Sequence, residues 1–324
     1  MRNAFAIGLD VGGTRIAAGL VERKGRIVRE TKLLTPKAAG PFAIVDAIVA
    51  AVNEITGGVH PSEIAGIGIG LPAQIDFTRQ SVEYCVNLPL AGIDMRGLVM
   101  SRLKYPVTID NDGHTAALGE SRYGAAKGLR DFIMVTLGTG VGGGVFIDGK
   151  LHRGSRGFGG ELGHMVIAVD GPACPCGGRG HLESFAARPA IVRAARAAAE
   201  TYHGSSISRL AGGDAEKITA ELVIKAANDD DEAAVEVMSL VGDMLGEGLV
   251  GLVNVLNPQA IIVGGGIGES CPLVSRRAAA RIAAEALAGR RDIRVLTAEL
   301  GNDAGVAGAA ALAFEDHDSR EGIH

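Results

Sequence analysis

Two segments of this chain share one pattern, in which a short apolar strand, a glycine-rich turn and a second apolar strand follow one another. The first segment covers residues 5–21 (FAIGLDVGGTRIAAGLV) and the second covers residues 132–148 (FIMVTLGTGVGGGVFID). Apolar strands joined by a tight glycine turn form a β-hairpin with a buried face. The recurrence of this unit predicts an internal duplication.

The first hairpin places a carboxylate beside its turn. Asp10 ends the first strand, where its carboxylate can hold hydrated Mg²⁺. The turn that follows consists of Gly12, Gly13 and Thr14, whose backbone N–H groups and hydroxyl can reach phosphate oxygens without obstruction by side chains. An ordinary hairpin with a solvated aspartate fits the same residues equally well.

The second hairpin contains Gly138-x-Gly140-x-x-Gly143, which formally matches a dinucleotide-binding fingerprint. That fingerprint must open a helix, whereas residues 145–147 continue as a β-branched and aromatic strand. The mismatch excludes a Rossmann domain and a nicotinamide-dependent oxidoreductase. Gly138, Thr139 and Gly140 instead favour a second phosphate-binding hairpin that faces the first.

A buried strand over residues 107–109 opens onto Asp110-Asn111-Asp112-Gly113-His114, before a helix that we expect over residues 115–124. Polar side chains at the C-terminal end of a strand lie where α/β sheets usually carry their ligands. The alternative is a local role, in which Asn111 or Asp112 caps the helix.

A third glycine-rich segment, residues 264–268, separates a strand over residues 260–263 from a helix ending near residue 288. A glycine loop there lets the backbone of Gly265 and Gly266 approach a nucleotide, and a tight packing turn is the alternative. The remaining pattern predicts strands over residues 26–34, 64–71 and 293–297, helices over residues 41–55, 185–202, 215–256 and 304–314, and a frayed tail from residue 315.

Residues 160–183 gather potential metal ligands at high density. His164, Cys174, Cys176 and His181 form a complete Cys2His2 set, and Glu161 and Glu183 flank them. Thiolate sulfur and imidazole nitrogen bind zinc in a closed tetrahedron, which makes the predicted site structural. Two reduced, buried cysteines and two hydrogen-bonding histidines are the alternative.

Length and charge exclude several classes of protein. With 324 residues and 47% hydrophobic content, the chain can build two domains with their own cores. A net charge of −5 provides no basic face for nucleic-acid phosphates, so we expect a small-molecule partner. Uninterrupted apolar runs stay well below the roughly 18 residues of a membrane span. The N-terminal sequence and the four cysteines favour a cytoplasmic protein over a secreted one.

Taken together, these motifs resemble the ROK family (repressor, open reading frame, kinase) of sugar kinases over essentially the whole chain. Six segments match in order: residues 10–14 (DVGGT), 111–120 (NDGHTAALGE), 137–140 (LGTG), 160–164 (GELGH), 174–183 (CPCGGRGHLE) and 300–305 (LGNDAG). One motif of this kind is weak evidence, whereas six in the same order are specific.

The resemblance implies an α/β fold, namely a duplicated ribonuclease-H-like fold of the actin/hexokinase ATPase type with two domains around a cleft. We expect a small N-terminal domain over residues 1–115, completed by a C-terminal helix at about residues 304–324. A large domain over residues 116–303 would carry the zinc-binding loop. A homodimer or higher homo-oligomer is likewise expected from the resemblance.

The implied activity is ATP-dependent phosphorylation of a hexose, with glucose as the first choice and glucose 6-phosphate as its product. Asp112 is the expected base, and the expected sugar-binding residues are Asn111, Asp112, Glu161, His164 and Glu183. Asp10 and the glycine hairpins would hold Mg²⁺ and ATP, while Zn²⁺ would be structural. Mannose, fructose, N-acetylmannosamine and N-acetylglucosamine remain alternative substrates, and the phosphoryl donor is open.

The chain departs from the family pattern at a few positions. His181 stands where the family has a third cysteine, which keeps the number of zinc ligands. Arg156 and Phe158 stand where small residues and an asparagine are usual, and this leaves the hexose preference open. Ala73 replaces a common glycine, which we expect to be a minor change.

Other functions on the same fold explain the sequence less well. A sugar-sensing repressor of this family carries an N-terminal helix-turn-helix domain, whereas here the phosphate hairpin begins within the first ten residues. A nucleotide-dependent chaperone or structural protein would not require the cluster in residues 160–183. We therefore expect the kinase, with a regulator that lacks a DNA-binding domain as the alternative.

Overall fold

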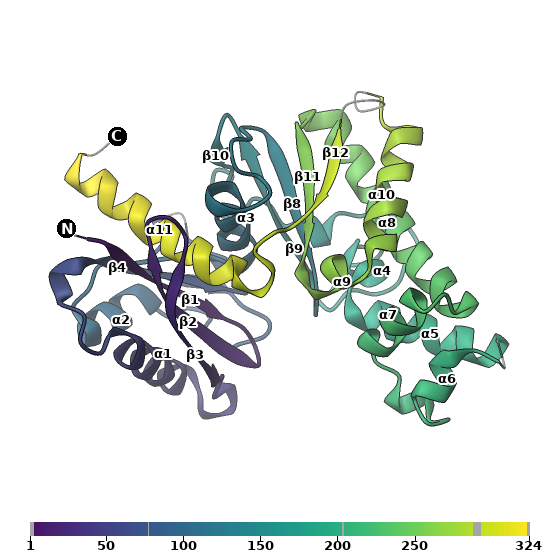
Figure 1. Ribbon diagram of the computed structural model, residues 1–324, viewed down its shortest axis with the longest axis horizontal. Helices are drawn as coiled ribbons and strands as arrows, with labels where there is room; N and C mark the ends of the chain where they lie inside the picture. Colours follow the sequence, from purple (N-terminus) through teal and green to yellow (C-terminus); the bar gives the residue numbers. More distant parts are fainter. Residues whose placement is uncertain (1–2, 77, 203, 288–292, 323–324) are drawn as a thin grey trace. The chain divides into compact units, whose positions relative to one another are not determined.

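The computed structural model describes residues 3–76, 78–202, 204–287 and 293–322 (Figure 1). One five-stranded sheet has the order β3-β2-β1-β4-β7. Its strands are β1 (Phe5–Val11), β2 (Arg15–Glu22), β3 (Ile27–Leu34), β4 (Ile64–Leu71) and β7 (Val107–Asn111). The first three strands pair antiparallel, and β4 lies parallel to both β1 and β7.

A second five-stranded sheet repeats this order as β10-β9-β8-β11-β12. Its strands are β8 (Phe132–Leu137), β9 (Val141–Ile147), β10 (Lys150–Leu151), β11 (Ala260–Gly264) and β12 (Arg294–Thr297). In this sheet β11 lies parallel to both β8 and β12. The predicted duplication and the duplicated ribonuclease-H-like fold are therefore confirmed.

The helices begin and end close to the predicted limits, with some differences. They are α1 (Pro41–Thr56), α2 (Met95–Leu103), α3 (Asp112–Tyr123), α4 (Glu183–Ala186), α5 (Arg188–Thr201), α6 (Ser206–Leu210), α7 (Ala220–Asn228), α8 (Glu232–Leu256), α9 (Gly265–Ser270), α10 (Pro272–Glu285) and α11 (Ala304–Glu321). Two short strands, β5 (Gln74–Ile75) and β6 (Val82–Tyr84), form a separate two-stranded sheet. The helix predicted over residues 215–256 is interrupted, because Asp231 caps α8 by accepting a hydrogen bond from the Ala234 N–H. The end predicted near residue 288 lies outside the described residues.

The chain forms two compact units. Unit 1 comprises residues 1–128, 144–160 and 302–324, and unit 2 comprises residues 129–143 and 161–301. The domain boundary expected at residue 115 would cut α3 near its start. The division into units instead keeps the whole of α3 in unit 1. Helix α3 packs on α11 at backbone distance, where a Cβ on Gly308 would lie 1.7 Å from the Thr115 carbonyl oxygen.

Helix α11 also packs directly on the first sheet. A Cβ on Gly8 of β1 would lie 1.9 Å from the Val306 carbonyl oxygen, and one on Gly68 of β4 would lie 1.7 Å from that of Ala309. Glycines in neighbouring strands therefore let this helix approach the sheet. Figure 1 shows α11, in yellow, running across β1 and β4.

The prediction of a frayed tail from residue 315 is wrong, because α11 continues to Glu321. The reason is a tertiary contact that no local pattern reveals. Arg23 donates to both carboxylate oxygens of Asp318, at 3.0 and 2.9 Å, and its guanidinium lies 4.7 Å from the centre of the Phe314 ring. These contacts stabilise the polar end of the helix.

Helix α8 is long and apolar enough to cross a membrane by length and composition, with a mean hydropathy of 1.4 over an 18-residue window. Its apolar residues are interrupted by charged ones, so no uninterrupted apolar run reveals it. In the structure α8 packs against α10, and two of its carboxylates pair with arginines of that helix. Arg277 of α10 binds Asp243, and Arg281 binds Glu247. These contacts hold α8 against α10, and 39% of the apolar window of α8 is buried.

Candidate active site and metal cluster

The turn of the first hairpin is held by hydrogen bonds that leave its outer side open. Gly12 N–H donates to the Arg15 carbonyl at 2.9 Å, and the Thr35 hydroxyl donates to the Gly12 carbonyl at 2.7 Å. A Cβ on Gly12 or Gly13 would meet nothing closer than 3.4 Å. Packing therefore does not require these glycines, which is consistent with a turn that keeps space for a ligand.

Asp10 lies at the end of β1, partly buried, beside the first turn of α11. A Cβ on Gly305 would lie 2.8 Å from the Asp10 carboxylate carbon, so glycine at 305 makes room for this carboxylate. Burial raises the pKa of Asp10, and Arg15 opposes this effect. Among the described residues, none donates a hydrogen bond to the carboxylate. A partly buried carboxylate without donors fits a hydrated Mg²⁺ ion.

Asn111 ends β7 and caps α3, so the capping alternative is confirmed for this residue. Its Oδ1 accepts the N–H groups of Gly113 and His114, at 2.8 and 3.2 Å, and its Nδ2 donates to the Ala73 carbonyl at 3.2 Å. Because Asn111 caps the helix, α3 begins at residue 112 rather than 115. Asp112 is thus the first helical residue, partly exposed, and its Oδ1 accepts the Gly113 N–H at 2.8 Å.

Behind this turn lies a charged network that local sequence patterns do not predict. The side chain of Asp110 is 3% exposed and is surrounded by donors. Its Oδ1 accepts from the Asn111 N–H and faces His114 Nδ1, both at 2.9 Å, while Oδ2 lies 2.7 Å from both Nε and Nη2 of Arg153. Burial favours a higher pKa for Asp110, but the hydrogen bond with His114 and the charge of Arg153 outweigh it and hold the pKa at about 2. Asp110 is therefore ionised at neutral pH.

The Asp110 network borders a cavity of about 210 Å³. Its lining residues are Ile75, Asp76, Arg79, Asp110, Arg153 and Gly157. The spacing of Asp110 and His114, four residues apart across the start of a helix, was the one signal in the sequence that could have revealed part of the network. Arg153 gave no signal, because it comes from a distant loop.

In unit 2, Glu183 connects the zinc-binding region to the second hairpin. Its Oε2 accepts the Val141 N–H at 2.9 Å, and a Cβ on Gly140 would lie 2.5 Å from the same oxygen. A Cβ on Gly138 would meet nothing within 4 Å, and Thr139 beside it is exposed. The structure thus places a predicted sugar-binding carboxylate directly against a predicted phosphate-binding turn.

The prediction of a glycine loop over residues 264–268 is wrong, because α9 begins at Gly265. Gly265 has a φ of +77°, and its N–H donates to Glu269 Oε1 at 3.1 Å. A Cβ at this position would lie 2.5 Å from the Leu137 carbonyl oxygen. Backbone conformation and packing both require glycine at 265, as the packing alternative predicted. A nucleotide-binding role for Gly265 and Gly266 stays a prediction.

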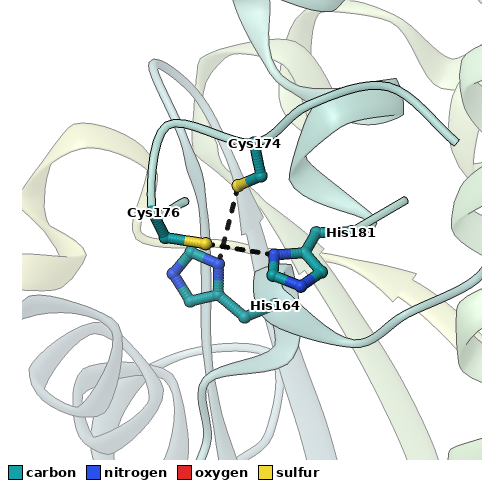
Figure 2. A group of neighbouring side chains, drawn as sticks. All are labelled: His164, Cys174, Cys176 and His181. Carbon is teal, nitrogen blue, oxygen red and sulfur yellow. Dashed lines mark hydrogen bonds between the residues drawn. The ribbon is translucent and has the colours of Figure 1, made fainter. Parts of the chain in front are cut away.

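Four potential zinc ligands converge in unit 2 (Figure 2). One ligand atom from each of His164, Cys174, Cys176 and His181 lies within 4.8 Å of all the others. The sulfur of Cys174 lies 3.9 Å from His164 Nδ1, and that of Cys176 lies 3.2 Å from His181 Nδ1. Zinc bonds of about 2.3 Å to sulfur and 2.1 Å to nitrogen place tetrahedral S and N ligands about 3.6 Å apart. The observed distances bracket this value, so the donor set fits zinc.

The surroundings of the cluster bear on metal binding and on the side chains predicted to bind the sugar. Burial raises the pKa of the Cys174 thiol, so a bound cation is needed to favour the thiolate. The second ring nitrogen of His164 points away from Cys174 in Figure 2. Glu161, partly buried, precedes the short 3-10 helix that carries His164. In the loop before it, the Arg156 guanidinium lies 5.5 Å from the centre of the Phe158 ring.

The chain is similar to known proteins along nearly its whole length. It is 37% identical over 315 residues to a glucokinase of Streptomyces coelicolor, covering 96% of this chain and 98% of that protein. It is also 28% identical to a xylose repressor of Bacillus spizizenii, over 96% of this chain and 77% of the repressor.

Among solved structures, a ROK family glucokinase from Streptomyces griseus in complex with glucose and AMPPNP superimposes with a TM-score of 0.87 at 36% identity, covering 96% of this chain and 99% of the other. The model that describes the ROK family matches residues 6–316, a span that includes both hairpins, the strand-end turn and the Cys/His cluster. On this evidence the chain belongs to the ROK family.

Proposed function

We propose that this chain is a kinase that transfers the γ-phosphoryl group of ATP to glucose and forms glucose 6-phosphate. The observation that carries the proposal is the 36% identity, over 96% of the chain, to a structure in complex with glucose and AMPPNP. The identity of 37% to a glucokinase from Streptomyces coelicolor supports the same sugar.

Asp112 is the base in this proposal. The sugar hydroxyl oxygen attacks the γ-phosphorus, the bond from that phosphorus to the bridging oxygen of ADP breaks, and the hydroxyl proton passes to the carboxylate. The position of Asp112 at the first turn of α3 supports this role, because the Gly113 N–H holds one of its oxygens at 2.8 Å. Phosphoryl transfer depends mainly on positioning and on charge stabilisation, so a carboxylate with a fixed orientation suits it.

The other proposed contacts are made to the sugar hydroxyls and to the phosphates. Asn111, Glu161, His164 and Glu183 bind the sugar hydroxyls. Carboxylates accept hydrogen bonds from hydroxyls, while amide and imidazole groups can also donate to them. The backbone N–H groups of Gly13 and Thr14 in the first turn, and of Thr139 and Gly140 in the second, bind the phosphates of ATP. The N–H groups of Gly12 and Gly138 already donate within their own turns.

Two metal ions complete the proposal. Asp10 would hold Mg²⁺, which would supply positive charge to offset the charge of the phosphates. Zinc held by the Cys/His cluster would keep the loop over residues 171–180 folded and Glu183 in place. The role of zinc would be structural, and it would take no part in the transfer of the phosphoryl group.

The proposed setting is a cytoplasmic enzyme that acts as a homodimer or a higher homo-oligomer. ATP and free hexoses are available in the cytoplasm, and reduced cysteines suit zinc binding there. Sedimentation velocity of the full chain at micromolar concentration tests the oligomeric state, and a single species with the mass of one chain would contradict it.

The test of the activity is ADP release measured with ATP, Mg²⁺ and a panel of hexoses. We expect glucose to give the highest kcat/KM, above mannose, fructose, N-acetylglucosamine and N-acetylmannosamine. Replacing ATP with polyphosphate in the same panel tests the donor. Absence of ADP release with every sugar would reject the kinase, and a tenfold preference for another hexose would reject glucose as the substrate.

A further inference from the structure

The imidazole ring of His114 lies in the first turn of α3 with its side chain only 2% exposed. Its Nδ1 lies 2.9 Å from Asp110 Oδ1, and its Nε2 lies 2.6 Å from the Gly159 carbonyl oxygen. Both partner atoms can only accept hydrogen bonds, because the Asp110 carboxylate is ionised and a carbonyl carries no proton. Each ring nitrogen must therefore carry a proton for both contacts to be hydrogen bonds.

A neutral imidazole cannot satisfy this environment. It would place a nitrogen lone pair against one of two buried oxygens, leaving two buried acceptors in contact without a proton between them. The distance of 2.6 Å to Gly159 is short for a neutral N–H donor and agrees with a charge-assisted bond.

Other charges near His114 act in both directions. Asp110, from β7, favours the positive ring, and so does the carbonyl dipole of Gly159. Burial, the position in the first turn of α3, and the guanidinium groups of Arg153 and Arg79 oppose it. Arg153 is itself paired with Asp110 at 2.7 Å, and Arg79 lies farther off, 3.8 Å from the same carboxylate. The two acceptor atoms, one at each ring nitrogen, are what decide how many protons the ring carries.

We propose that His114 is a positioning residue that functions as a buried, doubly protonated imidazolium in the resting protein. It ties the Asp110 carboxylate to the Gly159 carbonyl, and so joins the start of α3 to the loop over residues 152–160. That loop leads by sequence into Glu161, and Asp110 precedes Asn111 and Asp112. The kinetic part of the proposal rests on the proposed kinase activity.

Arg153 acts on the same loop from the opposite end. Its guanidinium binds Asp110, while its carbonyl accepts the Gly159 N–H at 2.8 Å. The loop is therefore closed on itself at Gly159, and a Cβ there would lie 2.8 Å from the Arg153 carbonyl carbon. With His114 bound to Gly159 as well, the closed loop is held against β7 and α3 at two points.

The protonation state is tested directly by NMR on protein labelled with ¹⁵N-histidine. In long-range ¹H–¹⁵N spectra, the two nitrogens of an imidazolium resonate close together, whereas those of a neutral ring are widely separated. His114→Gln, which removes one ring, assigns the signal. We expect both His114 nitrogens to resonate in the protonated range in the folded protein, and a neutral pattern would overturn the proposal.

The positioning role is tested by the kinetics of His114→Gln, because glutamine can donate in only one of the two directions. The matched control is His152→Gln, the same substitution at an exposed histidine of the same loop. A misplacement near 1 Å can cost about 10²-fold in rate. We expect kcat/KM for the hexose to fall by about 10- to 100-fold in His114→Gln, with the KM for ATP within about twofold of wild type.

Each outcome decides one part of the proposal. If His114→Gln and His152→Gln have equal hexose kinetics, the positioning role is rejected even if the ring is doubly protonated. Equal losses for ATP and hexose would indicate general damage to the fold and reject it too, and melting curves of both variants accompany the kinetics. If the wild-type protein turns over no hexose, the proposed function fails, while the NMR result still decides the state of His114.

Discussion

The contact between Gly140 and Glu183 allows the two proposed roles of the second hairpin to be separated by single methyl groups. In Gly140→Ala, the new Cβ would lie 2.5 Å from Glu183 Oε2, and an ordinary contact needs at least 3.4 Å. The carboxylate oxygen must therefore move by about 0.9 Å. In Gly138→Ala, two residues away in the same turn, the Cβ would meet no protein atom within 4 Å.

The size of the effect follows from the bond that this displacement breaks. Glu183 Oε2 accepts the Val141 N–H at 2.9 Å, and a movement of that size lengthens the contact beyond hydrogen-bonding distance. A hydrogen bond to a charged group contributes about 1.5–3 kcal/mol. This energy sets the upper limit for the loss of glucose affinity. Because 1.4 kcal/mol corresponds to a tenfold change in an equilibrium constant, we expect Gly140→Ala to weaken glucose binding by at most about 10- to 100-fold. Gly138→Ala should instead raise the KM for ATP, since its methyl group fills space proposed for phosphate.

The assay is steady-state ADP release with glucose varied at saturating ATP, and then with ATP varied at saturating glucose. Calorimetric glucose titration without nucleotide provides a second measure of the sugar side, and melting curves confirm that both variants are folded. A Gly140→Ala enzyme with wild-type glucose affinity would show that Glu183 does not bind the sugar. A glucose defect of equal size in Gly138→Ala would show that the two ends of the turn do not have separate roles.

Four further predictions concern individual charged groups and the metal cluster. Asp112→Asn should keep sugar binding close to normal and lower kcat by about 10²–10⁴-fold, and a wild-type kcat would exclude Asp112 as the base. Asp10→Ala should raise the KM for Mg-ATP while calorimetric glucose affinity stays unchanged, and the reverse pattern would contradict the assignment of Asp10 to the nucleotide. Elemental analysis should find about one zinc per chain. His181→Cys should retain it, and so should Cys85→Ser, which changes a cysteine outside the cluster. His181→Ala should lose the zinc and raise the glucose KM, whereas a metal-free active wild-type protein would exclude the zinc site. Because the pKa of Asp110 is lowered from 3.8 to about 2 in the folded state, its stabilising effect is complete above about pH 4 and is lost as the pH falls towards 2. Urea unfolding should show about 2 kcal/mol of such loss, at 1.36 kcal/mol per pKa unit, and the same loss in Asp110→Asn would refute this origin.

Local patterns in the sequence were sufficient for the elements that carry the proposed site. The two glycine hairpins, the buried strand ending at residues 110–112 and the cluster of cysteines and histidines all depend on residues close together in the chain. Strand period, turn chemistry and ligand type act over such short distances, so each of these features was predictable. The choice between ligand binding and helix capping at Asn111 was not, because an asparagine before a helix has the same local pattern in both cases.

Tertiary structure decided which of these elements meet, since contacts between distant residues depend on how the chain packs. Arg153 reaches Asp110 from a loop 43 residues away, and Glu183 reaches Val141 across 42 residues. Neither pairing leaves a periodic signal, since one residue of each pair lies in irregular structure or at an element end. The polar end of α11 is likewise ordered by Arg23, 295 residues from its partner Asp318. The two acceptors at the ring of His114 come from β7 and from the loop over residues 152–160, so only the packed structure brings them to one side chain.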